Sequence, residues 1–240
     1  TTCSAVHAAD DLSVMETLEA LPYVIESTRG FIGGKPYRVG PSGIGTRDNP
    51  YGAGTAPNPN NQRVCLAKMD PRQRGLFAAA WALGYIAAFA RGGIEAVSIG
   101  APTGPMGIIY RHTDYPQPHF DDLKGPTVYP LYHVIAGLAA AAGSKQVAAT
   151  SADPAAVAVV AHRDTSGPAL WLANLTGSEQ AVKITGLGEG AATLHLLDEK
   201  SFVAATTDPA FLQKPGERLR RASGLTLGPY AVARVAPARR

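Results

Sequence analysis

Cysteine is scarce in this chain, and its placement argues against two classes of small stabilised fold. The 240 residues include only Cys3 and Cys65, which lie far apart and have no CxxC motif or histidine-rich segment beside them. A disulfide framework or a structural zinc site normally shows closely spaced cysteine pairs. We therefore expect neither, and we expect no bound metal and no cofactor.

The sequence also lacks a hydrophobic run long enough to cross a membrane. Its longest apolar stretch, Gly75–Ala90, is interrupted by Trp, Gly and Tyr at helical spacing, whereas a membrane span needs about 20 apolar residues. Residues 1–6 have neither the basic start nor the apolar stretch of a signal peptide. We expect a cytoplasmic protein with no membrane partner, in which the apolar stretch forms a buried helix.

An excess of charge of one sign is missing as well. The net charge is only +3, and much of it comes from six arginines near the C-terminus: Arg218, Arg220, Arg221, Arg234, Arg239 and Arg240. This charge is too small and too local to indicate a nucleic-acid partner. With 45% apolar residues, the chain is long enough to bury one or two ordinary cores.

What is present in residues 1–145 is an alternation of short strands, loops and helices. Strands are expected at Thr2–Val6, Tyr37–Val39 and Ile94–Ile99, and helices at Asp70–Ala90 and Thr127–Ala142. This order is typical of a parallel α/β fold, in which substrate chemistry occupies the loops that follow the strands. Three such units cannot close an eight-unit barrel. We predict a partial (β/α) TIM-type barrel, completed by a missing N-terminal barrel half or by another copy in a homo-oligomer.

Residues 146–240 have a different pattern, without an expected helix. Short strand candidates separated by turns lie at Ala155–His162, Ala169–Leu175, Ala181–Thr185, Ala191–Leu197, Gly224–Leu227 and Tyr230–Val235. Such spacing predicts an antiparallel β-sandwich. The fold class is thus α/β plus all-β, with domains at 1–145 and 146–240.

Several long segments resemble one family of enzymes. VHAADDLSVMETLEALPYV, FIGGKPYRVGPSGIG, TRDNPYGA, DPRQRGLFAAAWALGYIAAFARGG and SIGAPTGPMG are similar to segments of the D-apionate lactonases. That resemblance implies a hydrolase that opens a sugar lactone, D-apionolactone, to D-apionate in the breakdown of apiose. It also implies a longer protein, of which this chain matches the last strands of a glycoside-hydrolase-like barrel and the sandwich.

The first candidate site residues lie just after the first expected strand. Opening a lactone with water needs a base, a donor for the developing oxyanion and groups that hold the hydroxyls. His7 with Asp10 can supply the base, and Asp11 is expected to contact substrate. The alternative is that Asp10 or Asp11 only caps the following helix, in competition with Ser13, which forms a capping box with Glu16.

Further candidates lie after the second and third strands. Arg47 is expected to contact the lactone carbonyl or oxyanion, since a guanidinium suits both. Arg38, Ser42, Asn49, Tyr51, Thr103 and Tyr110 are expected to bind substrate. Ser42 is a weak candidate for a nucleophile, because Pro41 and Ile44 break the G-x-S-x-G pattern. For each of these residues the alternative is a role in the loop scaffold.

Two other functions stay open. A retaining glycoside hydrolase of a related barrel would place a carboxylate at the end of the penultimate strand. If Tyr37–Val39 is that strand, the first carboxylate after it is Asp48, several residues away, which disfavours this interpretation. The remaining alternative is a non-catalytic carbohydrate-binding fragment. The sequence therefore predicts a lactonase whose partner is a small sugar lactone.

Overall fold

The structure is a computed structural model, and it describes residues 10–45, 53–164, 167–187, 191–220 and 224–238. The helices are α1 (Asp11–Glu16), α2 (Leu21–Ile32), α3 (Leu76–Arg91), α4 (Pro130–Ala139) and α5 (Phe202–Thr207). Three 3-10 turns are η1 (Thr17–Ala20), η2 (Pro71–Arg74) and η3 (Phe211–Gln213). The strands are β1 (Arg38–Ser42), β2 (Ala96–Ile99), β3 (Lys145–Val147), β4 (Val157–Asp164), β5 (Gly167–Asn174), β6 (Gln180–Val182), β7 (Ala191–Leu197), β8 (Glu217–Arg220), β9 (Leu225–Leu227) and β10 (Val232–Pro237).

The barrel-like part contains two parallel strands joined by a helix. β1 pairs with β2 in parallel, with Val39 opposite Val97 and Ser42 opposite Ile99, and α3 makes the crossover between them. This arrangement confirms the predicted β-loop-α-β order. The strand expected at Thr2–Val6 lies outside the described residues. Because β1 and β2 are parallel, their carboxyl ends, and the loops after them, lie at one edge.

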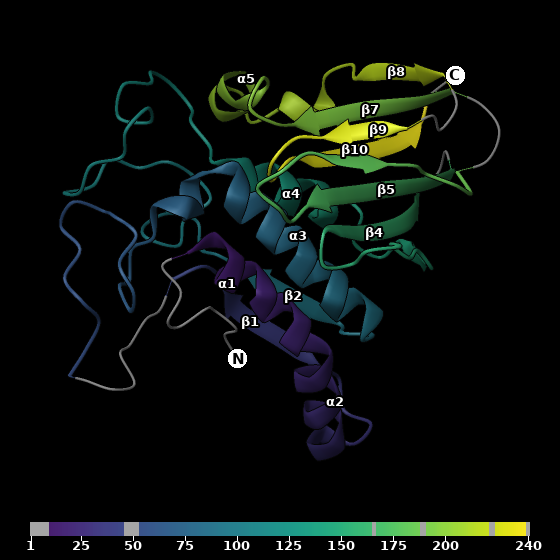
Figure 1. The fold of residues 1–240 in the computed structure, drawn as a ribbon, viewed down its shortest axis with the longest axis horizontal. Helices are drawn as coiled ribbons and strands as arrows, with labels where there is room; N and C mark the ends of the chain where they lie inside the picture. The colour runs from purple at the N-terminus through teal and green to yellow at the C-terminus, as the bar shows by residue number, and fades with distance from the viewer. Residues whose placement is uncertain (1–9, 46–52, 165–166, 188–190, 221–223, 239–240) are drawn as a thin grey trace.

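Helix α3 lies at the centre of the molecule (Figure 1). It contacts α2 and α4 on the barrel side and β4, β5 and β10 of the sandwich. Its side chains are therefore buried on nearly every face, including a row of packed rings at Trp81, Tyr85 and Phe89. One hydrophobic core runs from α1 and α2 through α3 to Trp171 of β5. The prediction that the apolar stretch forms a buried helix is confirmed.

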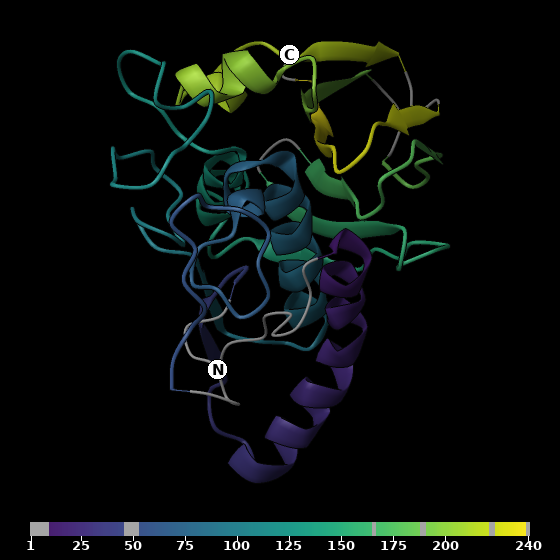
Figure 2. The ribbon, with the colours of Figure 1, turned by 60° about the vertical axis from the view of Figure 1, so that its left-hand side comes forward.

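The C-terminal part is an antiparallel β-sandwich, as predicted. One sheet has the strand order β3-β4-β5-β10-β7-β8, and a smaller sheet pairs β6 with β9. Apolar side chains of the two sheets, among them Leu172, Leu227 and Val235, form a second core between them. The opposite face of the large sheet packs on α3, and Gly137 of α4 lies against Trp171 of β5, while α2 runs away from the sheets (Figure 2).

Three local expectations were wrong. Asp10 rather than Ser13 caps the first helix, because its carboxylate accepts from both the amide and the hydroxyl of Ser13 at 2.8 Å. The helix expected from Asp70 is divided, since extended backbone at Gly75 separates η2 from α3. The sandwich also contains the short helix α5, although no helix was expected there.

Candidate functional site

Four of the predicted site residues lie outside the described residues. They are His7, Arg47, Asn49 and Tyr51. Their assignment as base, oxyanion contact and hydroxyl-binding groups therefore stays a prediction. We also expect His7, the segment containing Arg47 and the turn at Thr103 to share one pocket rim, and this too stays a prediction.

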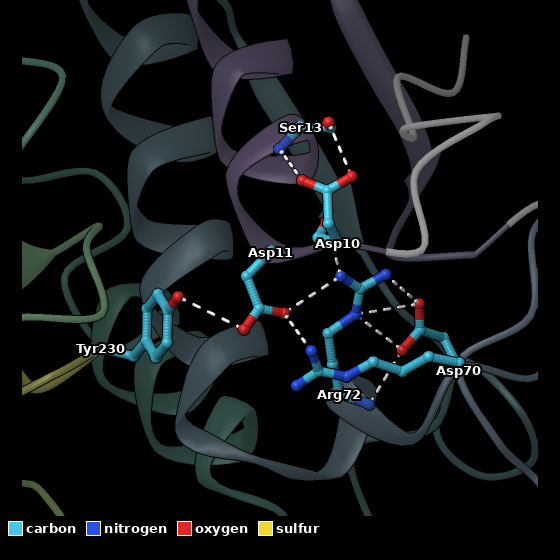
Figure 3. A network of polar contacts seen from close by, with 7 residues as sticks. Asp10, Asp11, Ser13, Asp70, Arg72 and Tyr230 are labelled. Carbon is cyan, nitrogen blue, oxygen red and sulfur yellow. Dashed lines mark hydrogen bonds and ion pairs between the residues drawn. The ribbon is translucent and has the colours of Figure 1, made fainter.

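Asp10 and Asp11 take part in a polar network that joins three segments distant in the sequence (Figure 3). Its centre is Arg72, which is 5% exposed. Arg72 Nη1 donates to the backbone carbonyl of Asp10 at 2.9 Å and to Asp11 Oδ1 at 3.2 Å. The same guanidinium donates to both oxygens of Asp70, at 2.7 Å from Nη2 to Oδ2. The network holds the start of α1 against the end of the long loop after β1.

Each carboxylate in this network has its acceptors in use. Both Asp10 oxygens receive hydrogen bonds from Ser13, and these bonds lower the pKa of Asp10. Asp11 Oδ1 also forms an ion pair with Arg63 at 2.9 Å, and Asp11 Oδ2 accepts from the Tyr230 hydroxyl at 3.4 Å. Burial acts to lower the pKa of Arg72, but its hydrogen bonds and charge pairs with Asp70 and Asp11 outweigh that effect and raise it. For Asp10 and Asp11 this geometry matches the alternative of a capping and joining role.

Arg38 and Ser42 lie at opposite ends of β1. Arg38 opens the strand and forms an exposed ion pair with Glu95, with Nε 2.9 Å from Oε2, beside the start of β2. Its side chain is therefore at the amino edge, away from the substrate-facing loops at the carboxyl edge. Ser42 closes the strand and is fully buried, with its hydroxyl 2.8 Å from that of Tyr85. Arg38 thus lies away from the loops at the carboxyl edge. Ser42 lies at that edge, where its carbonyl accepts from the Gly100 amide, but its side chain is buried.

Thr103 and Tyr110 belong to the loop after β2. Thr103 is exposed beside Gly104, and the Tyr110 hydroxyl donates to Asp121 Oδ1 at 3.0 Å. The other Asp121 oxygen accepts from the backbone N–H of Gln117 at 2.7 Å. The structure thus brings these two predicted residues into the loop region at the carboxyl edge of β2.

A small pocket opens to solvent at this edge. Its walls come from the loop after β1, from η2 and from the loop between β2 and α4. The lining residues are Asn61, Met69, Asp70, Arg74, Gly104, Pro105, Tyr115, Gln117 and Tyr129. None of these residues was predicted as a site residue, although Gly104 and Pro105 come directly after Thr103.

Arg74 is the cation of this pocket. It is half-buried, and desolvation lowers the pKa of its guanidinium. With the Asn61 amide oriented so that its oxygen faces Arg74, that oxygen accepts from the guanidinium, at 2.9 Å from Nη2. Burial also raises the pKa values of Tyr115 and Tyr129, which keeps both phenols protonated. The pocket lining therefore combines the Arg74 cation and two protonated phenols with the Asp70 carboxylate, which accepts from Arg72.

Gln117 holds the back of the pocket in place. It is 1% exposed, and its side-chain amide donates to the Arg111 carbonyl at 2.9 Å and to Thr113 Oγ1 at 3.1 Å. Its side-chain oxygen accepts a short hydrogen bond from the Tyr129 hydroxyl. These bonds fix the Tyr129 ring and the loop wall. In the described part of the chain, no three His, Cys, Asp or Glu side chains are grouped to hold a metal ion.

Two protein families match successive parts of the chain. A family described as D-apionate lactonase, TIM barrel domain, matches residues 1–143. The chain belongs to the D-apionate lactonase family. The family's C-terminal immunoglobulin-like domain matches residues 154–235. The predicted resemblance and fold class are confirmed.

A curated relative and two solved structures agree with this membership. The chain is 39% identical over 183 residues to the D-apionate lactonase of Brucella anthropi, a match that covers 75% of this chain and 28% of that protein. An arabinofuranosidase structure shares the fold with a TM-score of 0.59 at 11% identity, covering 95% of this chain and 50% of the other. The structure of the alpha-L-arabinofuranosidase from Thermotoga maritima gives a TM-score of 0.51 at 12% sequence identity. The match covers 95% of this chain and 48% of the other.

The curated lactonase is much longer than this chain. The chain spans a little over a quarter of the length of that relative, so the activity of a whole lactonase is proposed for it rather than assigned to it.

No helix in the described ranges is long and apolar enough to cross a membrane.

Proposed function

We propose that this chain forms part of a hydrolase that opens the ring of D-apionolactone to give D-apionate. The observation that carries the proposal is the match of residues 1–143 to the lactonase barrel, supported by 39% identity to a curated D-apionate lactonase. The pocket at the carboxyl edge supports it, because substrates of parallel barrels bind at this edge. The enzyme class is carboxylic ester hydrolase.

The proposal needs no glycosyl-enzyme intermediate. The described residues from Val39 to Gly45 contain no Asp or Glu, so the end of β1 does not supply the carboxylate nucleophile of a retaining glycosidase. We retain His7 with Asp10 as the proposed water-activating pair, and Arg47 and Asn49 as the proposed contacts of the lactone carbonyl. Asn and Arg side chains can stabilise a developing oxyanion by donating hydrogen bonds.

We also propose that further barrel strands, from the rest of a lactonase polypeptide or a second copy, cover the open side of β1 and β2. Ala96 and Ser98 on β2 are exposed, as are Arg38 and Pro41 on β1, whereas the strands of a closed barrel face a packed interior. Sedimentation of the chain tests this: we expect self-association, and an inert monomer at all concentrations would contradict it. We further propose that the two domains divide at 145/146 and that the protein is cytoplasmic.

A product assay tests the reaction. The chain is assayed alone and as a chimera in which it replaces the matching segment of the Brucella anthropi relative. Ring opening of D-apionolactone is monitored by NMR, and an aryl α-L-arabinofuranoside serves as the glycoside comparator. We expect D-apionate to form faster than by spontaneous hydrolysis, and His7→Ala to abolish this in a folded protein. Release of the aryl group without ring opening would instead identify a glycosidase, and binding without either reaction a carbohydrate-binding module.

A further inference from the structure

The loop between β2 and α4 folds back on itself at the carboxyl edge of the barrel strands. The Tyr110 amide donates to the Thr127 carbonyl at 3.0 Å, and the Tyr129 amide donates to the Ile108 carbonyl at 3.0 Å. We call residues 108–129 the returning loop. Tyr110 is one of the residues that we expect to bind substrate, and Tyr129 lines the pocket. The positions of both rings depend on what holds this loop.

Helix α5 of the immunoglobulin-like domain lies against the returning loop (Figure 1). The carbonyls of the last turn of a helix have no partner within the helix. In α5, the buried Thr206 carbonyl accepts from the Val128 amide at 3.0 Å, and the buried Ala205 carbonyl lies 2.8 Å from Nε2 of His133 in α4. The end of α5 is thus hydrogen-bonded to the barrel side, at the residue that precedes Tyr129.

Phe202, at the start of α5, reaches the same loop through aromatic packing. Its ring centroid lies 6.2 Å from that of Phe120 and 5.3 Å from that of His119. Phe120 is 3% exposed, and its ring packs edge-to-face on Tyr129 at 4.8 Å and stacks with Tyr110 at 6.4 Å. Aromatic rings about 4.5–7 Å apart attract each other. Phe120 therefore connects a ring of the immunoglobulin-like domain to both tyrosines of the carboxyl edge.

The backbone on each side of Phe120 is also held. His119 has a φ of 72°, a left-handed conformation that a residue other than glycine keeps where its surroundings enforce it. Its Nε2 lies 3.3 Å from Oγ1 of Thr206 in α5. On the other side, Asp121 accepts from the Tyr110 hydroxyl at 3.0 Å. A shift of Phe120 would therefore displace both the Tyr110 ring and the partner of its hydroxyl.

We propose that Phe202 is a positioning residue for lactone binding, because it holds Phe120 and thereby sets the places of Tyr110 and Tyr129 at the carboxyl edge. This inference rests on the proposed lactonase function, in which Tyr110 is expected to bind substrate. Side chains that bind substrate need supporting contacts that fix their position. The immunoglobulin-like domain thus contributes to the substrate site through a residue that acts on the barrel loop.

Amide hydrogen exchange of the 240-residue chain, measured by NMR, tests the support of the loop. In Phe202→Ala, we expect the amides of Tyr110 and Tyr129 to exchange about 10-fold faster while the amides of β5 keep their rates. Phe202→Leu keeps much of the apolar volume and should give a smaller change in the same direction, and it decides the test if Phe202→Ala does not fold. Val203→Ala is the matched control on the same helix, since Val203 is 58% exposed, and it should change none of these rates.

Two results of this measurement would overturn the proposal. One is unchanged exchange at Tyr110 and Tyr129 in both Phe202 variants. The other is an equal acceleration in β5, because it would show only a loss of global stability.

Kinetics of the chimera with D-apionolactone provide a second measurement. A residue that only stabilises the fold changes the amount of active enzyme, whereas a positioning residue for substrate binding changes KM. We expect Phe202→Ala to raise KM about 10-fold and to change kcat less than about twofold, because a contact made equally in the ground state and the transition state affects KM alone. Val203→Ala should leave KM unchanged. Equal KM values in the two variants would overturn the proposal.

The two proposals fail in distinguishable ways. Faster exchange at Tyr110 and Tyr129 in Phe202→Ala, in a chain and chimera without lactone turnover, would remove the proposed reaction and leave Phe202 as the support of the loop. Turnover of D-apionolactone, with exchange and KM that Phe202→Ala does not change, would remove the role of Phe202 alone.

Discussion

The hydroxyl of Tyr230 lies 3.4 Å from Oδ2 of Asp11, although 219 positions separate the two residues. The other oxygen of Asp11 accepts from Arg72 and pairs with Arg63. The immunoglobulin-like domain, the first helix and the end of the long loop thus meet at one carboxylate. Arg72 also binds Asp70, which lines the pocket, so the junction connects to one wall of the pocket.

Arg72→Ala should strongly destabilise the protein. It leaves Asp70 and Asp11 without their buried cation, and breaking a buried pair by removing one partner costs about 3–5 kcal/mol. We expect about 3 kcal/mol, because the Asp11 side chain is 26% exposed and retains Arg63. Urea unfolding measures the change. Arg38→Ala is the control, since its pair with Glu95 is exposed to solvent, and it should leave the unfolding midpoint unchanged; equal losses would contradict this account.

Gly137→Ala should destabilise the protein although alanine favours helices. A β carbon on Gly137 of α4 would overlap the ring of Trp171 in the immunoglobulin-like domain. Overpacking costs about 1–3 kcal/mol, which outweighs a gain of about 1 kcal/mol in helix propensity. Gly30→Ala in α2 is the matched control, because nothing lies within 4 Å of the added carbon. It should raise the thermal midpoint; a rise in both variants would show that α4 can shift away from β5.

Ser42→Ala should lower stability without lowering turnover. The hydroxyl is fully buried and bonded to that of Tyr85, and losing one such bond costs about 1 kcal/mol. Ser98→Ala, at an exposed serine of the neighbouring strand, should change neither quantity. Urea unfolding and the lactone assay measure both. Loss of turnover at unchanged stability would return Ser42 to the set of substrate-binding residues.

His133 should make stability depend on pH in the weakly acidic range. It is 1% exposed, its Nε2 lies 2.8 Å from the Ala205 carbonyl, and burial lowers the pKa of its imidazole. A lowered pKa means that the unfolded chain binds the proton first, so stability is complete above the unfolded pKa of about 6.5 and decreases as pH falls. In His133→Gln, the unfolding midpoint should change less between pH 7 and pH 5 than it does in the unsubstituted chain. His112→Gln, at an exposed histidine, should not; an unchanged slope in His133→Gln would contradict the assignment.

The parts of the fold that were predictable had strong local signals. β-branched strands, Gly92-Gly93 after α3 and a long apolar stretch indicated the two strands and the central helix in the right order. Strand β8 and helix α5 were missed because Glu217–Arg220 is charged and Phe202–Thr207 is rich in residues that disfavour helices. Their conformations depend on pairing with β7 and on contact with α4, which are tertiary interactions.

The candidate site was harder to predict, for a related reason. In the segment DPRQRG, Arg72 and Arg74 look equivalent, and only the folded chain pairs one of them with two carboxylates and leaves the other facing a pocket. Asp10 and Ser13 are likewise both good caps, and the choice between them depends on backbone geometry. The one available signal for the pocket was the length of the loop after β1, which ends at Asp70 and supplies Asn61.

Because one hydrophobic core passes from α1 and α2 through α3 to Trp171 of the large sheet, α3 packs on both halves of the chain. A recombination event that exchanged the immunoglobulin-like domain for another would strip one flank of this helix, and one that exchanged the barrel would remove the helix from beneath the sheet. We therefore expect the two halves to tolerate exchange only as a pair, and a larger residue at Gly137 to require a smaller one at Trp171.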